Sequence, residues 1–126
     1  MTERDRAAEH PLATTAEATD WQRIVTLFDL LARVDPSPVV ELNRAVALAM
    51  RDGPNVGIEG IDRILETGEL VDYHPAHVAR AELLRRMGRT TDAQAAYRRA
   101  LQLAHQDPER HLIERKLDEA DGIQIA

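Results

Sequence analysis

The stretch that decides the fold is residues 45–64, which read AVALAMRDGPNVGIEGIDRI, and residues 81–100 repeat its pattern as AELLRRMGRTTDAQAAYRRA. Small and apolar residues recur at matching places 36 positions apart. The matched pairs are Ala45 with Ala81, Leu48 with Leu84, Gly57 with Ala93, Ile61 with Tyr97, and Ile64 with Ala100. The same helical hairpin is therefore expected twice between residues 35 and 104.

A period in the mid-thirties with two helices per unit is typical of helical repeats of the tetratricopeptide kind. The sequence predicts an all-α solenoid fragment of about six helices. The expected helices are residues 19–34, 38–50, 57–65, 75–87, 91–104 and 108–120. Residues 1–18 are expected to be a flexible leader, residues 19–122 one helical domain, and residues 123–126 a tail.

The predicted helix starts rest on capping patterns. Ser37 precedes Pro38, which suits a serine cap followed by proline in the first turn. Thr19 with Gln22, and Thr91 with Gln94, have the spacing of capping boxes. The sequence therefore predicts that Thr19 and Thr91 cap their helices through their side chains.

The predicted core combines the first helix with an inner helix that is apolar almost all round. Trp21 and Phe28 of the first helix are expected to insert toward residues 38–50. If Phe28 is buried in this way, its removal should cost about 3 to 5 kcal/mol. An inner helix without a polar face is expected to pack on both sides.

Composition excludes several classes of function. The chain has 126 residues, a formal net charge of −6 and no cysteine. An acidic chain does not favour contact with nucleic acid, and the lack of cysteine excludes disulfides and thiolate metal sites. No apolar run is long enough for a membrane span, and the charged first residues do not suit a signal peptide. We expect a cytoplasmic protein that contacts other proteins.

The sequence carries no catalytic, phosphate-binding or cofactor motif, so we expect neither an enzyme nor a cofactor. His74 and His77 lie three positions apart with Asp72 nearby, but a structural or solvated role fits them better than a metal site. An alternative function is a small-molecule sensor, in which His74, His77 and Asn43 supply polar contacts to an apolar pocket.

A partner-binding groove is predicted along the inner helices. Its candidates are the inner-helix positions left after the contacts between helices are assigned: Leu42, Asn43, Val46, Met50, Glu82, Arg85 and Arg86. Asn43 has two interpretations, a buried amide bonded to nearby backbone or a groove residue that holds a partner's backbone. The arginines near residues 80–99 are either a solvated face with ion pairs or a docking patch for an acidic partner.

A family resemblance adds to this interpretation. Residues 36–47 (PSPVVELNRAVA) are its specific part, supported by Thr19-Asp20-Trp21, Tyr73-His74, residues 79–89 and residues 108–110. Over about residues 15–120 the chain resembles the C-terminal extension of group 42 extracytoplasmic-function (ECF) sigma factors of bacteria. The regions that bind polymerase and promoter in that family are absent from this sequence.

The resemblance implies a regulatory role in transcription initiation through protein contacts with sigma regions, RNA polymerase or a regulator. It implies no direct contact with nucleic acid by this domain. A free-standing adaptor protein and a scaffold that only spaces the sigma regions are two alternatives. A second copy of the chain is a further possible partner, paired through the open ends of the repeat.

Overall fold

The structure, a computed structural model, describes residues 19–125, with side-chain surroundings for residues 19–120. Over this range the chain is all-helical and has no strand. The helices are α2 (Trp21–Val34), α3 (Pro38–Asp52), α4 (Pro54–Glu66), α5 (His74–Arg86), α6 (Thr90–Leu103) and α7 (Asp107–Ile125). The predicted leader, residues 1–18, lies outside the described residues.

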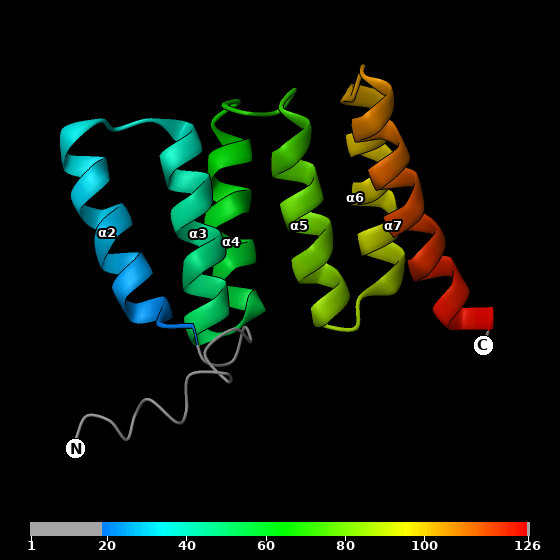
Figure 1. Cartoon of the computed structure of the whole chain (residues 1–126), viewed down its shortest axis with the longest axis horizontal. Coiled ribbons are helices and arrows are strands. Elements are labelled where there is room, and N and C mark those ends of the chain that lie inside the picture. Colours follow the sequence, from blue (N-terminus) through cyan, green and yellow to red (C-terminus); the bar gives the residue numbers. More distant parts are fainter. Residues whose placement is uncertain (1–18, 126) are drawn as a thin grey trace.

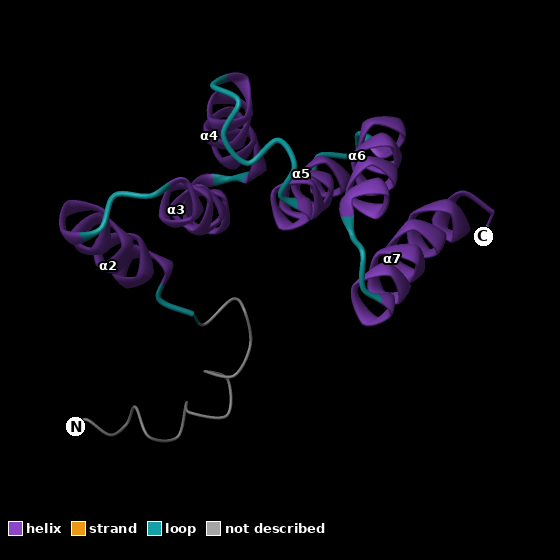
Figure 2. Cartoon of the chain, turned by 90° about the horizontal axis from the view of Figure 1, so that it is seen from above, coloured by secondary structure: helices purple, strands orange, loops and turns teal. Residues whose placement is uncertain are grey.

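Successive helices run in alternating directions and stand side by side along the molecule (Figure 1). Seen along the helices, α3, α5 and α7 occupy one side and α4 and α6 the other, with α2 beside α3 (Figure 2). Each helix packs on the next in the chain, and α3 also contacts α5. We call α3, α5 and α7 the inner helices and α4 and α6 the outer helices.

The helix starts recur with the expected period. α3 begins at Pro38 and α5 at His74, and α4 begins at Pro54 and α6 at Thr90, so both differences (74 − 38 and 90 − 54) are 36 residues. The matched residues Ile61 and Tyr97 are both fully buried in the core. The two hairpins therefore repeat at the spacing that the sequence predicts.

Gly57 explains how closely α4 approaches its neighbours. A Cβ atom at this position would lie 2.5 Å from Ala49 Cβ, 2.8 Å from Leu83 Cδ1 and 2.9 Å from the Ala45 carbonyl oxygen. Those distances leave no room for a methyl group. Glycine at this position lets α4 sit against both α3 and α5.

The predicted caps are right at one helix and wrong at two. The Ser37 hydroxyl accepts a hydrogen bond from the Val40 N–H at 3.2 Å, which confirms that cap. At α2 the cap is Asp20, whose carboxylate accepts from the Arg23 N–H at 3.0 Å, and not Thr19. At α6 the N-cap residue is Arg89 and no side chain caps the helix, so the capping box predicted at Thr91 is absent. A capping pattern one or two residues out of place can still mark the start of a helix, because backbone carbonyls and water can satisfy the first N–H groups.

One expectation about the core is confirmed and another holds only in part. The inner helix α3 packs on both sides, since it contacts α2, α4 and α5, although Val39, Glu41 and Asn43 are exposed. Val25 is the buried residue of α2, whereas Trp21 and Phe28 are only partly buried. In addition, α7 continues to Ile125 instead of ending near residue 120.

Candidate protein-binding groove

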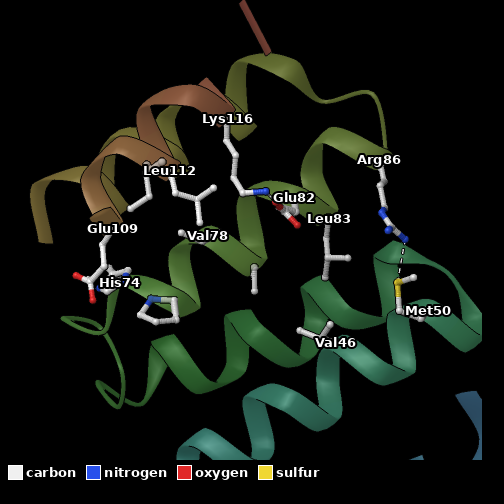
Figure 3. A pocket seen from close by; sticks show the side chains of 13 residues that line it. Val46, Met50, His74, Val78, Glu82, Leu83, Arg86, Glu109, Leu112 and Lys116 are labelled. Carbon is white, nitrogen blue, oxygen red and sulfur yellow. Dashed lines mark hydrogen bonds and ion pairs between the residues drawn. The ribbon is translucent and has the colours of Figure 1, made fainter. Parts of the chain in front are cut away.

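A groove with a volume of about 410 Å³ lies across the three inner helices. Val46 and Met50 reach it from α3, a row of side chains from His74 to Arg86 forms its centre on α5, and Leu112 and Lys116 close it from α7 (Figure 3). The inner helices stand side by side (Figure 1), so their equivalent turns are neighbours and bring these residues together.

Aliphatic side chains form most of the groove wall. They are Val46, Met50, Val78, Ala79, Leu83, Leu112 and Ile113. Leu83 and Ile113 are buried beneath the surface, whereas Leu112 keeps 44% of its surface exposed. Exposed apolar surface in a concave site favours contact with an apolar ligand or an apolar side chain of a partner.

An ion pair between Lys116 of α7 and Glu82 of α5 spans the groove (Figure 3). The Glu82 carboxylate accepts a hydrogen bond from the Lys116 ammonium, and this bond raises the pKa of Lys116. The two side chains retain 29% and 35% of their exposed surface, so the pair is only partly shielded from water. It fastens α7 to α5 and neutralises both charges at the groove centre.

Arg86 lies at one end of the groove beside Met50. Its Nη1 atom donates toward the Met50 Sδ atom over 2.9 Å. Among residues 19–120, no carboxylate forms an ion pair with Arg86. A thioether sulfur is a weak acceptor, so this guanidinium retains most of its capacity to bind a carboxylate.

His74 lies at the opposite end, with its Nε2 atom 3.9 Å from Glu109 Oε1. His77 does not reach the groove, because its Nε2 atom lies 2.9 Å from the Val71 carbonyl oxygen in the loop before α5. In the described part of the chain, no group of three or more His, Asp or Glu side chains could hold a metal ion.

Four of the seven predicted groove residues line the groove, namely Val46, Met50, Glu82 and Arg86. Leu42 is 4% exposed and belongs to the core, so its prediction as a contact residue is wrong. Asn43 is exposed and does not line the groove, which excludes the buried-amide interpretation. Arg85 is exposed and lies outside the groove.

Sequence reasoning missed the contribution of α7. We expected a polar end helix, yet Glu109, Leu112, Ile113 and Lys116 line the groove. Each lies 34 positions after an α5 residue of the groove, Pro75, Val78, Ala79 or Glu82. A search for a second period of 34 residues would have found them.

Three of the six arginines between residues 80 and 99 form ion pairs. Arg80 Nε lies 2.7 Å from Asp62 Oδ1, Arg89 Nη2 lies 2.6 Å from Asp92 Oδ2, and Arg99 Nη2 lies 3.6 Å from Asp72 Oδ1. The solvated-face interpretation therefore holds for these three residues. Arg86 is the member of this cluster that faces the groove.

Comparison with known proteins finds one curated relative at a significant level. The chain is 40% identical over 112 residues to an uncharacterized protein of Rhizobium meliloti (strain 1021). The match covers 89% of this chain and 26% of that protein, so the chain spans about a quarter of its relative's length. No family model and no solved structure matches. No described helix has the length and apolar character needed to cross a membrane.

Proposed function

We propose that this chain is a non-catalytic protein-interaction domain with a tetratricopeptide-like repeat that modulates bacterial transcription initiation. On this proposal it acts as the C-terminal extension of a group 42 ECF sigma factor, which it resembles at residues 36–47. The partner is a polypeptide segment from the sigma regions, RNA polymerase or a regulator.

The observation that carries the proposal is the groove itself. Inner helices of a helical repeat bind polypeptides in their concave surface, where apolar walls provide affinity and a few charges provide orientation. Here Val46, Val78 and Leu112 supply the apolar wall, and Arg86 supplies a charge without a carboxylate partner. A partner segment with apolar side chains and a carboxylate opposite Arg86 complements this surface.

The test is a binding measurement with two defined probes. These are purified bacterial core RNA polymerase and the sigma regions of a group 42 factor from which the C-terminal extension has been removed. We expect the chain to bind one of them, and Val46→Glu and Arg86→Glu each to weaken binding by about tenfold or more, since burying an unpaired charge costs more than 1.4 kcal/mol.

Arg98→Glu is the matched control, because Arg98 is exposed on α6 outside the groove. Binding of neither probe, or equal binding by the groove variants and the wild-type chain, contradicts the proposal. Circular dichroism of each variant establishes that the helices remain folded.

The dimensions of the groove favour a second candidate, a small-molecule sensor. A volume of about 410 Å³ with a mainly apolar lining falls within the range of small-molecule pockets. A metabolite present at 100 times its Kd would stabilise the fold by about 2.7 kcal/mol, and thermal-shift screening would detect it. Stabilisation that is lost in Leu112→Glu and unchanged in Arg98→Glu would favour the sensor.

A further inference from the structure

The groove runs obliquely across the inner helices, from the first turns of α5 and α7 to the last turns of α3 and α5. His74 and Arg86 are the first and last residues of α5, and both line the groove. Their separation of 12 residues (86 − 74) corresponds to about 18 Å along a helix. A segment that occupies the groove lengthwise therefore spans about 18 Å.

The two ends of the groove carry opposite charges (Figure 3). Arg86 lies at one end and pairs with no carboxylate among residues 19–120. Glu109 lies at the other end, where 42% of its side chain is exposed and no lysine or arginine of that range pairs with it. The 3.9 Å between His74 Nε2 and Glu109 Oε1 is longer than a hydrogen bond. Both end charges can therefore bind a charge of a partner.

The middle of the groove offers few partners to the backbone of an extended segment. Asparagine, glutamine, serine and threonine are absent from its lining in the described part of the chain. The charges at its centre, Lys116 and Glu82, bond each other. An extended segment would leave N–H and C=O groups unpaired against aliphatic walls, whereas an α-helix bonds these groups within itself. The lining therefore favours a helix.

We infer that the occupant of the groove is an amphipathic α-helix of the partner, antiparallel to α5, with an acidic first turn and a basic last turn. This inference rests on the proposed function, because it names the kind of segment that binds there. Since α5 runs from the Glu109 end to the Arg86 end, an antiparallel helix places its N-terminus at Arg86. Acidic residues in the first turn and basic residues in the last turn also stabilise that helix itself. A parallel helix would need the opposite charges, which its own dipole disfavours.

The span of the groove gives the expected pattern of the bound helix. An acidic and a basic residue about 11 positions apart lie on one face of a helix and about 16 Å apart along its axis. Apolar residues about four and seven positions after the acidic one lie on the same face and meet the aliphatic wall.

The first experiment selects peptides from a displayed library of random sequences of about 15 residues. The wild-type chain and the Val46→Glu variant are the parallel baits. Peptides enriched by the wild-type chain alone are expected to have apolar residues at helical spacing, with Asp or Glu before them and Lys or Arg after them. A two-residue period or the reverse charge order overturns the inference and leaves groove docking intact. A selection that enriches nothing also overturns it, while the polymerase and sigma-region probes still decide the proposed function.

Proline substitution tests the helical form of the bound peptide. In the most enriched peptide, proline at a central position outside the apolar face should weaken binding by about tenfold or more, because proline breaks a helix. Alanine at the same position is the control and should change the Kd by less than about twofold. Equal affinities of the proline and parent peptides overturn the helical form.

A charge exchange tests the direction of the bound helix. Arg86→Glu should weaken binding of the parent peptide by about tenfold or more, and Glu109→Lys by about threefold or more. A peptide with its end charges exchanged should bind the Arg86→Glu/Glu109→Lys double variant about threefold or more tighter than the wild-type chain. Arg98→Glu, on the exposed surface of α6 outside the groove, is the control. Both peptides binding every variant equally overturns the antiparallel arrangement.

Discussion

Met50 and Arg86 occupy the same position in successive hairpins and touch each other across the groove. They lie 36 residues apart, and the Arg86 Nη1 atom is 2.9 Å from the Met50 Sδ atom. The repeat thus converts a separation in sequence into a contact between neighbouring inner helices. Arg86 lies at the end of the groove without a carboxylate partner. It is therefore the residue that we expect to bind a carboxylate of the partner in the proposed docking site.

The core should depend on Ile61 more than on Phe28. Ile61 is fully buried between the hairpins, whereas the ring of Phe28 is partly exposed. We expect Ile61→Ala to lower the free energy of unfolding by about 2 to 5 kcal/mol. Phe28→Ala should cost less than Ile61→Ala, because part of the Phe28 ring already contacts water in the folded chain. Urea unfolding of both variants checks this order, and a larger loss for Phe28→Ala would contradict it.

Gly57 and Gly60 form a matched pair on one helix. An added methyl group at Gly57 meets Ala49 Cβ at 2.5 Å and a backbone oxygen at 2.9 Å, whereas at Gly60 the nearest atom is Ala45 Cβ at 3.1 Å. We expect Gly57→Ala to destabilise the fold by about 1 to 3 kcal/mol through overpacking. Gly60→Ala should be close to neutral, because the gain in helix propensity of about 1 kcal/mol offsets a small displacement of Ala45. Thermal melts that show equal losses would refute the close approach at Gly57.

The Lys116–Glu82 ion pair should contribute modestly to stability. Both side chains are about one-third exposed, so water screens their attraction. A double-mutant cycle with Lys116→Met and Glu82→Gln should give a coupling of about 0.5 to 1 kcal/mol at low salt and less at high salt. The Arg89–Asp92 pair, about half exposed on both sides, is the control and should couple more weakly. Coupling that does not change with salt would contradict this estimate.

Tyr97 should lose its proton at a higher pH in the folded chain than in the unfolded chain. Burial raises the pKa of Tyr97, and the negative charge of Glu82 raises it further. In a Tyr73→Phe variant the remaining tyrosinate absorbance reports Tyr97, since the chain has two tyrosines. We expect the folded midpoint to lie above the value of about 10 that the same variant shows in urea. A folded midpoint equal to or below the unfolded one would contradict the burial of Tyr97.

The same shift predicts how stability depends on alkaline pH. The pKa values of Tyr97 and Lys116 are both raised in the folded chain. Below about pH 10 both groups are protonated in the folded and unfolded chains, so their contributions to the free energy of unfolding are fully present there. These contributions are lost as the pH rises through the folded pKa values. Melting temperatures of the wild-type chain should therefore fall more steeply above pH 10 than those of a Tyr97→Phe/Lys116→Met variant.

Short-range patterns in the sequence predict most of the helices. Ser37 before Pro38 marks the start of α3, and glycine and proline near residues 53 and 54 mark the break before α4. The period of 36 residues follows directly from the matched small and apolar positions. These features depend on neighbouring residues and helical spacing, which a sequence records.

The choice between core and groove was decided by the tertiary structure. Leu42 and Val46 lie one turn apart on α3 and look alike in sequence, but Leu42 is covered by neighbouring helices while Val46 faces the groove. Likewise, Lys116 meets Glu82 only because α7 packs beside α5. The sequence alone determined that the chain folds as repeated helical hairpins, because hydrophobic periodicity and turn residues act locally. Which apolar faces are covered, and which charges meet, depended on how the helices pack, because burial is a property of the neighbours that a residue acquires in space.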